Sequence, residues 1–63
     1  MTQKELLYIE DAIGHEDNII KMCQESIKNM QNEDLITFIN NEINTHTNTK
    51  QKLMNILEVK SNG

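Results

Sequence analysis

Three polar residues, Glu16, Glu42 and His46, occupy positions where the sequence pattern otherwise places aliphatic side chains. In each half of the chain, apolar residues recur in steps of three and four, and these three residues fall on the same steps. An ionised carboxylate removed from water is costly unless it is paired, protonated or bound to a metal ion. Glu16, Glu42 and His46 are therefore the residues whose types and spacing can carry chemistry.

One chemistry that these residues suggest is metal binding. Carboxylate oxygens together with imidazole suit iron, manganese or zinc. Glu42 and His46 are four residues apart and share one helical face, and two copies of the chain supply four glutamates and two histidines. That is the ligand inventory of carboxylate-bridged di-iron and di-manganese bundles, although their Glu-x-x-His motif has a step of three. The sequence predicts a metal site with Glu16, His46 and Glu42 as ligands, of which Glu42 is the most dispensable.

The alternative is a polar network that holds no metal. Buried polar residues commonly fix register and orientation in coiled coils, at some expense in stability. His46 can donate a hydrogen bond to Glu16, and Glu16 can pair with Lys50. Matching the stripes outward from the turn places Glu16 and His46 in adjacent layers and Glu42 beside Cys23. Both interpretations stay open, and the metal interpretation predicts that manganese, iron or zinc raises the melting temperature.

Two helices must position these residues. Thr2 and Glu5 form a capping box before the first helix, and Asn32 is a suitable N-cap for the second. We expect helices over about 3–30 and 33–60, with a turn near 30–33. So short a connection makes the helices antiparallel neighbours, which predicts an all-α helical hairpin as a single domain over residues 1–63.

Each predicted helix carries a stripe of seam residues that faces the other helix. On the first helix the stripe is Leu6, Ile9, Ile13, Glu16, Ile20, Cys23, Ile27 and Met30, and on the second it is Leu35, Ile39, Glu42, His46, Thr49, Leu53 and Ile56. The apolar arcs extend beyond these stripes, to Ala12, Ile19, Tyr8, His15 and Met22 on the first helix and to Ile36, Ile43 and Leu57 on the second. Arcs this wide exceed what one partner helix covers. We therefore predict a homodimer in which two hairpins form a four-helix bundle.

Composition narrows the function. At 63 residues the chain is near the lower limit for a self-sufficient core. The net charge of −4, with lysine as the only strongly basic residue type, argues against nucleic acid or an anionic membrane as partner. No run approaches the roughly 18 apolar residues of a membrane span, and the N-terminus has no signal-peptide pattern. A single cysteine, Cys23, fits a reducing interior, which predicts a cytoplasmic protein.

Two parts of the chain resemble a known family. The segment from Lys4 to Glu16, followed by Lys21-Met22-Cys23-Gln24, resembles the first helix of small spore-coat-like proteins, members of the ferritin-like group in spore-forming Firmicutes. Leu35 through Phe38, His46, and Leu53 to Leu57 resemble the second helix of that family. The resemblance implies a ferritin-like helical hairpin, an association with spore-coat proteins and the spore, and a metal site built on Glu16 and His46.

The chain also departs from that family pattern. A second histidine is expected three residues after the first, and Thr49 stands there. The resemblance therefore supports the fold more strongly than an activity.

Three functions follow from the sequence, in order of preference. The first is a non-enzymatic structural or assembly protein, since catalytic triads, glycine-rich phosphate loops and CxxC pairs are all absent. The second is a metal-binding or ferroxidase-like bundle. The third is a small adaptor whose acidic outer face binds a basic partner protein.

Overall fold

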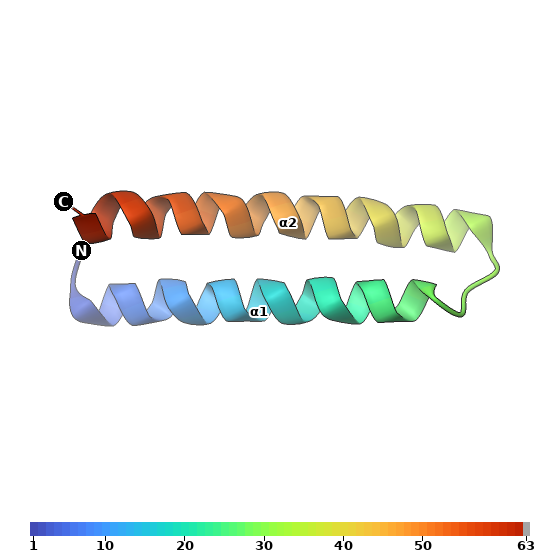
Figure 1. Ribbon diagram of the computed structural model, residues 1–63, viewed down its shortest axis with the longest axis horizontal. Helices are drawn as coiled ribbons and strands as arrows, with labels where there is room; N and C mark the ends of the chain where they lie inside the picture. Colours follow the sequence, from blue (N-terminus) through green and yellow to red (C-terminus); the bar gives the residue numbers. More distant parts are fainter. Residues whose placement is uncertain (63) are drawn as a thin grey trace.

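Two long helices and a short connection make up the chain (Figure 1). The computed structural model describes residues 1–62, with side chains through residue 60. Helix α1 comprises Gln3–Ile27 and helix α2 comprises Glu33–Asn62, and the two lie antiparallel, so that the beginning of α1 and the end of α2 share one end of the molecule. The predicted all-helical hairpin is confirmed. Helix α1 ends three residues earlier than expected, and α2 continues two residues further.

Local side-chain hydrogen bonds define where each helix begins. The Glu5 backbone N–H donates to Thr2 Oγ1 at 3.1 Å, and the Thr2 backbone N–H donates to Glu5 Oε1 at 2.9 Å. At the start of α2, the Leu35 backbone N–H donates to Asn32 Oδ1 at 3.0 Å. These bonds satisfy N–H groups that have no partner inside a helix. Both predicted caps are confirmed, and they fix the position of the turn.

The capping box makes the beginning of α1 sensitive to acid. Hydrogen bonds from the backbone and the side chain of Thr2 hold the pKa of the Glu5 carboxyl below its ordinary value of 4.5. A pKa that is lower in the folded state stabilises that state above the unfolded-state pKa, and this contribution disappears as the pH falls through the folded pKa. We expect an NMR titration of Glu5 to give a pKa that returns only part of the way toward 4.5 in Thr2→Ala, because this change removes the side-chain hydrogen bond and keeps the backbone N–H of residue 2. An identical Glu5 titration in both proteins would contradict the capping assignment.

The seam of α2 is rotated from the predicted one by about one residue. Ile36, Ile43 and Leu57 are partly covered by α1, whereas Leu35 is 51% exposed and Ile56 is 45% exposed. The predicted α2 stripe was therefore wrong at these positions. The physical reason is that two overlapping stripes, both with steps of three and four, share Ile39, His46 and Leu53. In the structure, Ile36, Ile43 and Leu57 occupy the seam, and Leu35 and Ile56 lie beside it.

The hairpin has a seam but no enclosed core. None of the side chains that the structure describes is buried, apolar or polar. The molecule measures 47 × 14 × 11 Å, which is the shape of two helices in a single layer. Each helix can therefore cover only one side of its neighbour.

Candidate functional site

The three predicted site residues meet around one imidazole ring. His46, near the middle of α2, lies between Glu16 of α1 and Glu42 one turn earlier in its own helix. Its Nδ1 is 2.5 Å from Glu16 Oε2, so a hydrogen bond joins the two side chains. Its Nε2 is 3.6 Å from Glu42 Oε2, which is the distance of an ion pair and too long for a hydrogen bond. We call these three residues the Glu–His–Glu cluster.

The cluster extends from the seam toward one flank of the hairpin. The side chain of Glu16 is 17% exposed, that of His46 is 26% exposed and that of Glu42 is 41% exposed. A neutral imidazole has one N–H donor, whereas the protonated ring has two and can donate to both carboxylates. The geometry is therefore that of a hydrogen-bonded network that joins the two helices through His46, with Glu42 as its outermost and least satisfied member.

An ion pair one turn away involves a residue that the sequence interpretation had assigned elsewhere. Lys50 Nζ lies 2.6 Å from Asp17 Oδ1, so Lys50 pairs with Asp17 instead of Glu16. The predicted stripe had placed Thr49 in the seam and Lys50 outside it, and the rotation of α2 brings Lys50 over the polar flank of α1. The sequence did offer one signal for this ion pair, because Asp17 and Lys50 carry opposite charges and each lies next to a predicted seam position. Within the described residues, His46 is then the only basic group in contact with Glu16.

The geometry makes Glu42, and not Glu16, the carboxylate that is better placed to bind a metal ion together with His46. His46 Nδ1 is engaged by Glu16, so Nε2, on the side of Glu42, is the ring nitrogen available to a metal. In that arrangement Glu16 orients the ring, as carboxylates behind metal-binding histidines commonly do. Among the described residues of one chain, no three histidine, cysteine or acidic side chains are arranged to hold a metal ion. A complete ligand set would require groups from a second copy.

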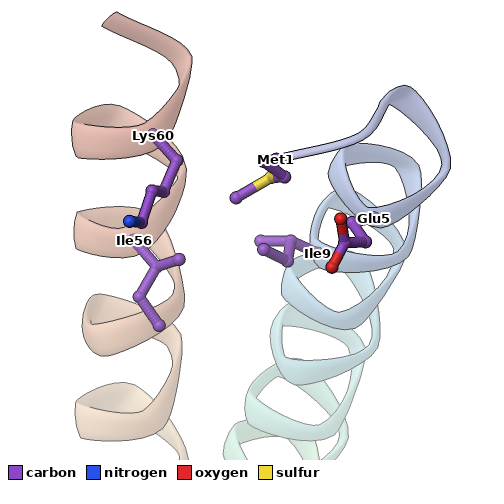
Figure 2. Close-up of a pocket in the computed structure, with 5 residues that line it drawn as sticks. All are labelled: Met1, Glu5, Ile9, Ile56 and Lys60. Carbon is purple, nitrogen blue, oxygen red and sulfur yellow. The ribbon is translucent and has the colours of Figure 1, made fainter. Parts of the chain in front are cut away.

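A groove lies at the end of the molecule that holds the beginning of α1 and the last turns of α2. Figure 2 shows Met1, Glu5 and Ile9 on one side of this groove and Ile56 and Lys60 on the other. Its lining is mostly apolar, and its carboxylate already accepts the hydrogen bond of the α1 cap. The groove therefore continues the apolar surface of the hairpin and does not gather groups for catalysis.

Two further findings bear on the function. Neither helix, over the residues described, contains an apolar stretch long enough to cross a lipid bilayer. No protein-family model, curated protein or solved structure matches the chain. The resemblance to spore-coat-like proteins of the ferritin-like group therefore stays a prediction that rests on the sequence segments named above.

Proposed function

We propose that the chain is a small structural or assembly protein that works as a homodimer, in which two hairpins form a four-helix bundle. The observation that carries this proposal is that no described side chain is buried while large apolar side chains are exposed along both helices. Folding must offset roughly 1–2 kcal/mol of backbone entropy per residue. A single seam between two helices supplies little burial for that purpose, so a second copy is needed to form a core.

The exposed apolar residues are concentrated on one side of the hairpin. In an antiparallel pair, the residues that directly precede the first seam residue of each heptad lie on the same side of the pair on both helices. The reason is that a two-fold rotation perpendicular to the plane of the two helices relates them, and this rotation keeps equivalent positions on the same side of that plane. With Leu6 and Ile36 as those seam residues, this side carries most of the large exposed apolar side chains. We call it the open face, and it comprises Glu5, Tyr8, Ala12, His15, Ile19, Met22 and Ser26 of α1 and Leu35, Phe38, Glu42, Thr45, Thr49, Lys52, Ile56 and Val59 of α2.

The open face is large enough for a stable dimer. A surface 47 Å long and 14 Å wide has a projected area of roughly 650 Å², and side-chain relief increases it, which approaches the ~800 Å² per partner of standard interfaces. Tyr8, Met22 and Phe38 are all more than half exposed in the lone hairpin. Exposed apolar surface of this extent is typical of a protein interface.

Sedimentation equilibrium tests the dimer directly. We expect a particle of twice the 7.3 kDa chain mass, and a melting temperature that rises with protein concentration because folding and association are coupled. A cooperatively folded 7.3 kDa monomer with a concentration-independent melting temperature would rule out the proposal. The resemblance to spore-coat-like proteins supports an assembly role in the spore, for which detection of the protein in purified spores is the corresponding test.

Metal binding is the second candidate function, and the Glu–His–Glu cluster favours it. A dimer through the open face places two such clusters at mid-length of the same bundle, which assembles four carboxylates and two imidazoles. Iron, manganese or zinc would then be held in each cluster by His46 Nε2 and Glu42, and it would supply Lewis-acid or redox chemistry.

Titration with metal ions distinguishes this candidate from a metal-free network. If the cluster binds metal, we expect Zn²⁺ or Mn²⁺ to raise the melting temperature of the dimer and to leave that of His46→Gln unchanged. Elemental analysis of the purified protein gives an independent readout. A melting temperature that none of the three metals changes would leave the network as the only role of the cluster.

A further inference from the structure

We propose that the two hairpins pair with their turns at opposite ends, so that Lys52 of the partner subunit contacts Glu42 and completes the Glu–His–Glu cluster. This inference rests on the proposed dimer through the open face and adds its orientation and a cross-subunit site. A two-fold axis between two such faces can run across the helices or along them. If the axis runs across the helices, each helix packs on its own copy and the turns lie at opposite ends. If the axis runs along the helices, α1 packs on α2 of the partner subunit and the turns lie together.

The orientation must be decided by side chains, because both arrangements place antiparallel helices next to one another. The Glu16–His46 contact fixes the register of α1 against α2. Helix α2 comprises Glu33–Asn62, so its centre is close to residue 47, and that level corresponds to about residue 15 of α1. A two-fold axis across the helices at this level pairs residues of α2 whose numbers are symmetrical about 47, and residues of α1 that are symmetrical about 15 to within half a residue.

With the turns at opposite ends, side chains of matching chemistry meet. The α2 pairs are Leu35 with Val59, Phe38 with Ile56, Glu42 with Lys52, and Thr45 with Thr49, and the α1 pairs are Tyr8 with Met22 and Ala12 with Ile19. Each apolar side chain of the open face thus meets another apolar one, the threonines meet each other, the Glu42 carboxylate meets the Lys52 ammonium group, and Glu5 meets Ser26. His15 meets its own copy at the centre.

With the turns together, the same face is mismatched. The residues of α1 then lie over the residues of α2 at their own level, as the Glu16–His46 register sets it. Ile19, at the level of residue 43, would cover Glu42, Glu5 would lie over Ile56, and Ser26 would lie over Leu35. Covering a carboxylate with an apolar side chain removes its water and supplies no partner, which is costly. The arrangement with turns at opposite ends avoids this cost.

Glu42 and Lys52 make little or no ion pairing with the described residues of their own chain, so each is available to a partner subunit. Glu42 is 41% exposed, and its only ion pair with a described residue of its own chain is the 3.6 Å contact with His46. Lys52 makes no ion pair with any described residue of its own chain. Association would remove water from Glu42, and Lys52 of the partner subunit lies at the level where it can replace that water. Two-fold symmetry forms the contact twice.

Distance measurement between spin labels tests the orientation. Gln31→Cys in a Cys23→Ser background places one label in each turn. Turns at opposite ends predict a separation close to the 47 Å length of the hairpin. Turns at the same end predict roughly 20 Å, about two helix diameters, and that result would overturn the orientation while leaving the dimer intact. A monomer in sedimentation would overturn the proposed function itself, so the two failures are distinguishable.

A charge exchange tests the cross-subunit contact. We expect Glu42→Lys and Lys52→Glu each to weaken dimerisation by about tenfold or more, and the double variant to recover most of the affinity. Lys21→Glu, an exposed lysine away from the open face, is the matched control and should leave the dimerisation constant unchanged within about twofold. Additive losses in the double variant would overturn the Glu42–Lys52 contact, since same-end turns place these residues about ten residues apart along the bundle, roughly 15 Å.

Discussion

Ile56→Glu is expected to dissociate the dimer and remove most of its helix content at micromolar concentration, while Met54→Glu leaves both intact. Ile56 is 45% exposed and lies on the open face, whereas Met54 is 41% exposed and lies on the opposite flank. In the dimer, a glutamate at position 56 would be forced against Phe38 of the second copy and lose its water. We expect a cost on the order of 2–4 kcal/mol per copy, enough to unfold a small domain.

The two variants are matched in exposure and in place along the helix, and they differ in that Ile56 also lines the groove opposite Glu5. Both change an exposed apolar residue to glutamate in the last third of the same helix. Local helix energetics even favour the opposite order, since a glutamate at 56 precedes Lys60 by four residues and a glutamate at 54 precedes Glu58 by four. Sedimentation and far-ultraviolet circular dichroism at several concentrations give the comparison. Equal effects of the two changes would show that the open face is not the interface.

The hairpin, its caps and its turn could be predicted from the sequence because each depends on local chemistry. The Thr2–Glu5 capping box and the Asn32 cap involve residues three positions apart, so their geometry follows once a helix begins there. The meeting of Glu16 with His46 could also be predicted, because a short turn fixes the register of one helix against the other. These features need no knowledge of long-range packing.

The rotation of α2 could not be predicted from the same pattern. Leu35 and Ile36, and likewise Ile56 and Leu57, are adjacent apolar residues, so two stripes fit the seam equally well. The choice between them is made by packing against α1 and by the Asp17–Lys50 ion pair, which links residues 33 positions apart. The rotation also determines which apolar residues remain outside. The open face, and the matched pairs across it, become visible only when the structure has fixed that choice.

His46→Leu is expected to destabilise the dimer by about 2–4 kcal/mol, although leucine is more apolar and is a better helix former. Replacement removes the only basic group that contacts Glu16, whose side chain is 17% exposed in one hairpin. The Glu16 and Glu42 carboxylates would then lose the imidazole that lies between them. Chemical denaturation at fixed protein concentration measures the loss, and a His46→Leu dimer at least as stable as the parent would contradict it.

The double variant Glu16→Leu/His46→Leu separates the cost of an orphaned charge from the value of the network. We expect it to recover most of the lost stability, with a coupling energy of about 1–3 kcal/mol between the two positions. Thr47→Leu, at an exposed position of the same helix outside the open face, is the control for the change to leucine and should be close to neutral. If the cluster specifies register, the double variant regains stability and yet broadens the distance distribution between spin labels in the turns. A recovery of stability with an equally narrow distribution would mean that the matched pairs of the open face set the register by themselves.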